Sequence, residues 1–250
     1  MNLVASVMCR NELGRFLPLA VSHLLSFCDS IAVLDDASDD GSADWLAKQD
    51  RVSLLRRDEP GFFEHEGRTR QELYDFTVAQ NPTHVLSIDC DEFIGDPLKV
   101  RQACSRGDIV FQLGLAEVWK ADVNNLYLRI DGHWKERRVP ILFRPKRGYT
   151  IRDRKLACGR EPQEIVKLAG RAREVGTTVY HMGWLDERAR AARYARYAEH
   201  DKGNYHARAH LQSIMFPDRK VRMATEPWPP ALESIREEIL EKTGSVPSTP

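Results

Sequence analysis

Cysteine is scarce in this sequence. The 250 residues include five, widely spaced and without a CxxC pair: Cys9, Cys28, Cys90, Cys104 and Cys158. An odd and scattered set indicates neither a disulfide framework nor a zinc knuckle. We therefore expect a protein of a reducing compartment, the cytoplasm.

Long apolar runs are also missing. No stretch approaches the roughly 20 apolar residues that a membrane-spanning helix needs. The first residues, "MNLVASVMCRNE", hold only a short apolar run with no basic residue before it, which is too little for a signal peptide. We expect no transmembrane segment, so that any contact with a membrane is peripheral or made through a partner.

The chain has no net charge, with 37 basic and 37 acidic residues, but the charge is unevenly distributed. Residues 1–100 contain nine Lys or Arg against eighteen Asp or Glu, a net −9, and the remainder is +9. Such a split suits a site that holds a cation and an anion together, and equally suits two solvated faces of opposite sign. The acidic first part argues against a nucleic-acid partner.

The order of apolar segments predicts an α/β fold. A hydrophobic content of 42% at this length favours one domain with appendages. In residues 1–100, the strand-like runs "LVASVM", "SIAVLDD", "VSLL" and "THVLSI" alternate with helical patterns, which is typical of a largely parallel sheet. We expect mixed strands in residues 101–185, helices in 186–243 and a disordered tail in 244–250.

Acidic residues follow two of the predicted strands. Asp35 and Asp36 come after "SIAVL", and Asp89 and Asp91 come after "THVLSI". Ligands of open α/β sheets bind beyond the carboxyl ends of the strands, and residues two apart on an extended segment point the same way. Two converging carboxylates repel each other unless a positive charge lies between them, and Mg²⁺ or Mn²⁺ commonly bridges carboxylates to substrate phosphates. The pattern predicts a divalent cation and a phosphorylated ligand, although acidic residues also commonly form turns.

Three segments, "MCRNE", "VLDDASDDGS" and "HVLSIDCDEFI", resemble the family 2-type glycosyltransferases with the GT-A fold. The resemblance covers roughly the first hundred residues. It implies a GT-A-type, Rossmann-like mixed sheet flanked by helices, with a helical C-terminal extension. Residues 1–100 would be the nucleotide-binding half of a single domain and residues 101–185 the acceptor-side half.

The resemblance also implies roles for residues that bind the nucleotide-sugar. Asp36 resembles the residue that contacts the nucleotide base, with Asp35 beside it as a stand-in. Arg10 and Glu12 match the loop that lines the nucleotide pocket, and Arg70 resembles an arginine that reaches the nucleotide. Arg70 is equally consistent with a solvated helix residue, and Glu12 with a helix cap.

The metal ligands, for Mn²⁺ or Mg²⁺, are implied in the same way. Asp91 resembles the DxD carboxylate that ligates the metal, and Asp89 the one near the ribose and the metal. His181, in "TTVYHMGW", resembles a third metal ligand from the C-terminal half, although a single histidine is more often structural. Four arginines would offset the charge of a nearby diphosphate or form a solvated face: Arg188, Arg190, Arg193 and Arg196.

The implied reaction is transfer of a sugar, with inversion, from a nucleoside-diphosphate donor to an acceptor hydroxyl. A carboxylate in the second half would deprotonate the acceptor, and spacing does not choose among Glu161, Glu164, Glu117, Asp122 and Asp131. We favour Glu161, inside "CGREPQE", because its Gly and Pro indicate a shaped loop. The family's acidic "ED" pair is missing here, and the sequence does not indicate whether the acceptor is a glycan, a lipid or a protein.

Two other functions compete with this interpretation. A GT-A-like module could serve as a non-catalytic nucleotide-binding scaffold. Sugar nucleotidyltransferases share the need for a metal and a nucleotide, but they usually carry a Gly-rich basic loop after the first strand. The corresponding segment here, "MCRNELGRF", has one glycine, which disfavours that class.

Overall fold

The computed structural model describes residues 1–203, 205–206, 208–216 and 221–244. The predicted fold class is confirmed: the protein is α/β, with parallel and antiparallel strands in a central sheet flanked by helices. The chain divides into two compact units. Unit 1 comprises Met1–Asp91, Pro97–Leu113 and Arg138–Thr177, and unit 2 comprises Glu92–Asp96, Gly114–Arg137 and Thr178–Pro250.

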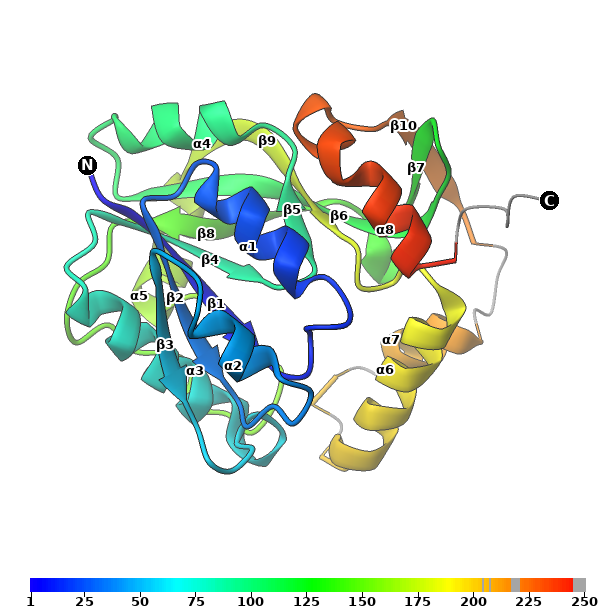
Figure 1. The fold of residues 1–250 in the computed structure, drawn as a ribbon, viewed down its shortest axis with the longest axis horizontal. Coiled ribbons are helices and arrows are strands. Elements are labelled where there is room, and N and C mark those ends of the chain that lie inside the picture. Colours follow the sequence, from blue (N-terminus) through cyan, green and yellow to red (C-terminus); the bar gives the residue numbers. More distant parts are fainter. Residues whose placement is uncertain (204, 207, 217–220, 245–250) are drawn as a thin grey trace. The chain divides into compact units, whose positions relative to one another are not determined.

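Unit 1 is built on a parallel sheet with the strand order β3-β2-β1-β4 (Figure 1). Its strands are the four that the sequence predicts, and a further strand, β8, pairs antiparallel with β4. Their bounds are β1 Leu3–Cys9, β2 Ser30–Asp35, β3 Val52–Arg56, β4 His84–Asp89 and β8 Arg137–Phe143. The parallel strands are apolar because they are buried on both faces, and most residues of β1, β2 and β4 are inaccessible to solvent.

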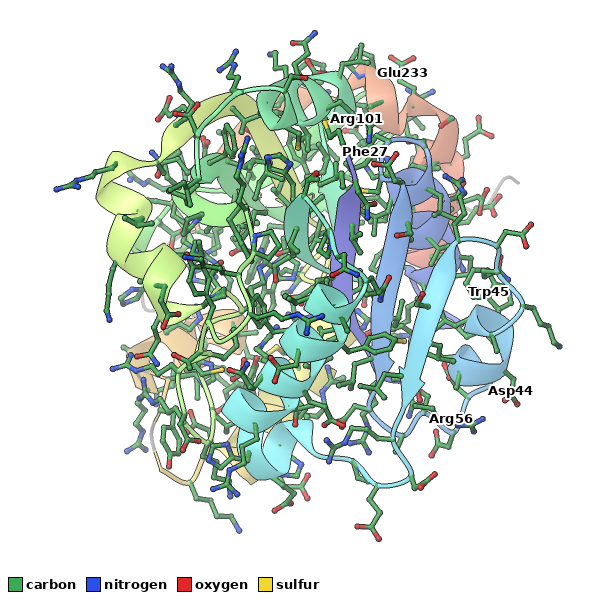
Figure 2. The ribbon with its side chains drawn as sticks, turned by 90° about the vertical axis from the view of Figure 1, so that its left-hand side faces the viewer. Phe27, Asp44, Trp45, Arg56, Arg101 and Glu233 are labelled. Carbon is green, nitrogen blue, oxygen red and sulfur yellow. The ribbon has the colours of Figure 1, made fainter. Side chains whose placement is uncertain are left out.

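The helices of unit 1 follow these strands. They are α1 Leu17–Leu25, α2 Ser42–Leu46, α3 Phe62–Ala79, α4 Pro97–Cys104 and α5 Gln163–Leu168, with a 3-10 turn η2 at Ala169–Arg171. Helix α3 is interrupted at His65, whose φ and ψ are −161° and 86°. At the end of β3, Arg56 donates a hydrogen bond of 2.9 Å to Asp44 of α2, and both side chains are exposed (Figure 2).

Unit 2 contains an antiparallel sheet with the order β10-β7-β6, and a short pair formed by β5 and β9. The residues of β6 and β9 are divided between the two units, and the first residue of β8, Arg137, belongs to unit 2. The strands are β5 Glu92–Ile94, β6 Val110–Ala121, β7 Asn125–Arg129, β9 Arg173–His181 and β10 Met223–Pro227. The helices are η1 Gly132–Trp134, α6 Glu187–His200, α7 Arg208–Met215, η3 Pro230–Ile235 and α8 Arg236–Lys242.

The segment expected to be helical, residues 186–243, holds α6, α7 and α8, but it also holds the strand β10. Met223–Pro227 is extended because its backbone pairs with β7, with Thr225 opposite Tyr127. The expected disordered tail, residues 244–250, lies outside the described residues except for Gly244. Within the described parts of the chain, none of the helices combines the length and the apolar character needed to cross a membrane.

The core of unit 2 is formed by aromatic rings around a buried arginine. Trp119, Trp134 and Trp184 pack together, and Arg129, only 1% exposed, lies over Trp119 and Trp134 at 4.5 and 4.8 Å from the ring centroids. Arg129 donates two hydrogen bonds of 2.9 Å to Asp131. The buried charge is therefore paired, as the low polarity of the surroundings requires.

Candidate functional site

The ends of the four parallel strands bring several charged residues to one edge of unit 1. In the register of the sheet, Cys9 of β1 lies beside Asp35 of β2, and Met8 lies beside Asp89 of β4. The residues that follow these strands therefore share the carboxyl edge, where open α/β sheets bind ligands. Both acidic strand ends lie at this edge, as their positions in the sequence predict.

Asp36 is fully buried at this edge and holds the beginning of α3. Its Oδ1 accepts a hydrogen bond from the amide of Gly61 (2.7 Å), and its Oδ2 accepts one from the amide of Phe62 (3.0 Å). Arg10 and Arg57 lie 3.7 and 3.4 Å from the carboxylate. A carboxylate at this position also interacts favourably with the helix dipole. Asp36 thus anchors a helix in addition to the nucleotide contact that the sequence predicts for it.

Asp35 and Glu12 shape the neighbouring loops. Asp35 accepts hydrogen bonds from the amide and the hydroxyl of Ser38, at 3.0 and 2.5 Å, and so closes the turn after β2. Glu12 pairs with Arg15 at 2.6 Å. Of the residues expected to line a nucleotide pocket, Arg10 and Asp36 are in contact, while Asp35 and Glu12 interact with their own loops.

Asp89 lies between two arginines of unit 1. Arg160 Nη1 is 3.1 Å from Asp89 Oδ2, and Arg70 Nη1 is 3.8 Å from Oδ1. Arg70 also donates to Glu66 at 2.7 Å. The side chain of Arg70 is 13% exposed and that of Arg160 is 9% exposed, whereas the side chain of Asp89 is 35% exposed. Burial alone would lower the pKa of Arg70, but the charges of Asp89 and Glu66 outweigh it and raise the pKa, so the guanidinium stays charged.

Arg160 is a residue of this site that sequence reasoning missed. It is 71 residues from Asp89 in the chain, and the only local signal is its place beside Glu161 in the "CGREPQE" loop. Arg160 also contacts Glu161, with 3.9 Å between Nε and Oε1. A cavity of about 10 Å³, which is room for about one water molecule, is lined in part by Ser6, Arg70, Ser87 and Arg160.

The predicted metal ligands fit a hard divalent cation unequally. Asp89 already has two guanidinium partners, so it fits least well as a direct ligand. Asp91 is a buried carboxylate of unit 1, and His181 belongs to unit 2, so the predicted ligand set spans both units. Among the residues whose placement is described, no three His, Cys, Asp or Glu side chains are grouped so that they could hold a metal ion. The ligand set of Asp89, Asp91 and His181 therefore stays a prediction.

His181 lies in a hydrogen-bonded network within unit 2. Its Nδ1 is 2.5 Å from Glu117 Oε2, and its Nε2 is 3.4 Å from Arg193 Nη1. Glu117 also accepts from Trp184 Nε1 (2.9 Å) and from Arg137 Nη1 (2.9 Å). Burial would raise the pKa of Glu117, but the interactions with His181 and Arg137 outweigh it and lower the pKa to about 2. Glu117 is therefore ionised at neutral pH.

The four arginines of α6 were expected either to lie near a diphosphate or to form a solvated face, and two of them contact the aromatic core of unit 2. Arg190 donates to the backbone oxygens of Trp119 and Trp184, at 3.2 and 2.5 Å, and lies over the Trp119 ring. Arg193 lies 4.5 Å from the ring centroid of Trp184. The basic aromatic pattern of this helix therefore reflects, at least in these two residues, packing between guanidinium groups and indole rings.

The carboxylates considered as the catalytic base differ in the hydrogen bonds and ion pairs that they make with the rest of the protein. Glu164 accepts from the amide and hydroxyl of Thr150, and Asp122 from two backbone amides and a tyrosine hydroxyl. Asp131 is paired with Arg129, and Glu117 accepts from three side chains. Glu161, by contrast, lies 3.9 Å from Arg160, which is longer than a hydrogen bond. It also lies in the same unit as Asp89 and Asp91.

Comparison with known proteins does not show a family for the chain. No protein-family model and no curated protein matches the sequence. Among solved structures, the chain is similar to a mannose-1-phosphate geranyltransferase from Thermus thermophilus, with a TM-score of 0.33 and 12% sequence identity over 99% of this chain and 68% of the other. A likeness at this level supports no conclusion about function.

Proposed function

We propose that the protein is a glycosyltransferase that moves a sugar from a nucleoside-diphosphate-sugar to an acceptor hydroxyl, with inversion. The observation that carries this proposal is the group of charged residues at the carboxyl edge of the parallel sheet. Arg10 and Arg57 lie beside Asp36, and Arg70 and Arg160 lie beside Asp89. This edge is where open α/β sheets bind nucleotides, and guanidinium groups bind phosphate oxygens.

Arginine and carboxylate residues would have separate tasks in this reaction. Arg70 and Arg160 are held in place by their acidic partners, so their donors are oriented before a diphosphate arrives. A Mn²⁺ or Mg²⁺ ion, for which Asp91 is the main proposed ligand with Asp89 and His181, would neutralise the diphosphate as the glycosidic bond breaks. Glu161 is the proposed base that takes the proton from the acceptor hydroxyl.

A non-catalytic nucleotide-binding scaffold is the second candidate. The partners of Asp36 and Asp89 favour this candidate, because both carboxylates already interact with other groups of the protein. For either function we propose a cytoplasmic location, in keeping with five cysteines that are all free and buried.

A thermal-shift screen of UDP-, GDP- and dTDP-linked sugars, with and without Mn²⁺, tests the proposal. A ligand at 100 times its Kd stabilises the folded protein by about 2.7 kcal/mol, which corresponds to a rise in Tm of roughly 5 to 10 °C for a chain of this size. We expect such a rise for one donor, dependent on Mn²⁺ and lost in Asp91→Ala. The matched control is Asp44→Ala, which removes an exposed carboxylate from the same unit.

The outcomes separate the candidate functions. Release of the nucleoside diphosphate from the stabilising donor, when Mn²⁺ is present, would support the transferase. Binding without such turnover would favour the scaffold. An absence of stabilisation by every donor would contradict both.

A further inference from the structure

A basic segment of unit 1 runs beside helix α3. Residues 144–155, "RPKRGYTIRDRK", contain six Lys or Arg and one Asp, and we call this segment the basic strap. Hydrogen bonds attach its backbone to the helix at three positions: the amide of Lys146 to the hydroxyl of Tyr74 (3.2 Å), the amide of Ile151 to Oε1 of Gln71 (2.6 Å), and the amide of Glu66 to the carbonyl of Lys155 (2.7 Å). The strap is therefore held along the helix and is not a loose loop.

Four cations of the basic strap are exposed and unpaired. None of them forms an ion pair with a residue that the structure describes: Lys146, Arg147, Arg152 and Lys155. Other arginines of unit 1 behave differently, since Arg57 pairs with Glu72 and Arg101 pairs with Asp29. The strap thus presents positive charge to solvent in a line that follows one stretch of backbone.

The carboxylates beside the strap have other partners. Asp153 lies 3.1 Å from the ring of His65 and 3.9 Å from Arg68. Glu164 accepts hydrogen bonds from the amide and the hydroxyl of Thr150, at 2.9 and 3.1 Å. These carboxylates leave the four exposed cations available for a ligand with negative charges.

The Lys155 end of the basic strap adjoins the proposed site. The amide of Glu66 holds the carbonyl of Lys155, and the carboxylate of Glu66 accepts a hydrogen bond of 2.7 Å from Arg70. Arg70 in turn lies 3.8 Å from Asp89. A ligand bound to the strap would therefore have one end close to the residues proposed for sugar transfer.

We propose that the basic strap binds an anionic glycan, one that carries carboxylate or phosphate groups, and that this glycan is the acceptor. Ammonium and guanidinium groups bind the oxygens of both kinds of anion, and a line of cations matches a chain with repeated negative charges. The role as acceptor rests on the proposed function, whereas the binding of the glycan does not.

The strap fits a glycan better than a single-stranded nucleic acid. Proteins that bind single strands combine a basic groove with aromatic rings that stack on the bases. Tyr149 is the only aromatic residue of the strap, and it is partly buried against the hydrophobic core around Phe143. The strap therefore offers charge without a surface for stacking.

Calorimetric titration with two probes tests the surface: an octamer of galacturonic acid and a phosphorylated mannan oligosaccharide, with neutral maltooctaose for comparison. We expect at least one charged probe to bind, more weakly as NaCl is added, and the neutral one not to bind. Arg147→Glu and Lys155→Glu should each weaken binding roughly three- to tenfold. Arg147→Gln, which removes a charge without reversing it, should have a smaller effect.

Lys48→Glu is the matched control, because it reverses an exposed cation elsewhere in unit 1 and changes the net charge by the same amount. It should bind the charged probe as the wild type does. Equal weakening in this variant would show that net charge is responsible and would overturn the inference. So would tighter binding of a single- or double-stranded oligonucleotide, or no binding of either charged glycan at low salt.

The thermal-shift screen separates this inference from the proposed function. The strap variants should keep the stabilisation by donor and Mn²⁺, because none of the changed residues belongs to the proposed nucleotide site. If a donor stabilises the protein but neither charged glycan binds, this inference fails alone. If a glycan binds the strap but no donor stabilises the protein, the proposed function fails and the role as acceptor fails with it, while the binding surface is confirmed.

Discussion

His84, the first residue of β4, should make the stability of unit 1 depend on pH. The side chain is buried, with Nδ1 3.2 Å from the Thr83 hydroxyl, and the buried Nε2 has no hydrogen-bond partner among the residues that the structure describes. Burial lowers the pKa of His84 from 6.5 to about 4, and the positive charges of Arg144 and the N-terminal amine act in the same direction. The folded protein therefore holds this histidine neutral at a pH where the unfolded chain would protonate it.

The sign and size of the effect follow from these pKa values. Between pH 6.5 and 4 the unfolded state binds more protons, so the free energy of unfolding is highest above pH 6.5 and falls as the pH drops toward 4. A change from 6.5 to about 4 corresponds to about 3 kcal/mol at full protonation. This is a large part of the stability of an ordinary domain, about 5 to 15 kcal/mol.

His84→Phe tests this reasoning, because it keeps an aromatic ring beside Phe111 and removes the titrating group. Urea unfolding, followed by far-UV circular dichroism from pH 4 to 7.5, gives the free energy of each protein. We expect the wild type to lose about 3 kcal/mol relative to the variant over this range. The control His200→Gln changes a partly exposed histidine and should follow the wild type. An equal difference between wild type and His84→Phe at pH 7 and at pH 4 would refute the account.

Three further substitutions test the interactions described above. Arg129→Met removes two charged hydrogen bonds to the partly exposed Asp131, so it should lower the free energy of unfolding by about 1.5 to 3 kcal/mol. Urea titrations measure this loss, and an unchanged free energy of unfolding would contradict it. Asp36→Asn replaces one of the carboxylate oxygens that accept hydrogen bonds from the amides at the start of α3, so it should lower the free energy of unfolding by about 1 to 3 kcal/mol. The amide of Gly61 should then exchange faster with solvent, and slow exchange there would contradict this prediction. Arg160→Gln should weaken nucleoside-diphosphate binding at least tenfold in calorimetric titrations, since a charged hydrogen bond contributes about 1.5 to 3 kcal/mol. An unchanged affinity would show that Arg160 does not bind the nucleotide.

The parallel sheet of unit 1 can be predicted because each strand is recognisable from its own residues. Apolar runs such as "THVLSI" have the length and composition of buried strands, and the order of strands and helices then limits the topology. The same logic places Asp35 and Asp89 at one edge. By contrast, β10 contains only five residues with a proline at its end, and nothing in that stretch predicts the pairing with β7 that makes it extended.

The interactions of the site were harder to predict because they join distant parts of the chain. Asp36 holds amides 25 and 26 residues away, and Glu117 lies 64 residues from its partner His181. A sequence pattern shows that a carboxylate follows a strand, but it does not show which groups will satisfy it. Asp89 illustrates the point, since its acidic neighbourhood predicted a cation and the structure supplies two guanidinium groups beside it.

The most direct test of the central claim is to map nucleotide binding onto the sheet edge by NMR. The protein would be titrated with the UDP-, GDP- or dTDP-linked sugar that stabilises it most, in the presence of Mg²⁺, and the amide signals of all residues followed. The account predicts the largest shifts at Arg10, Asp36 and the residues around Asp91, with no such shifts in Asp91→Ala. Shifts confined to other surfaces, or none with any donor at millimolar concentration, would contradict it.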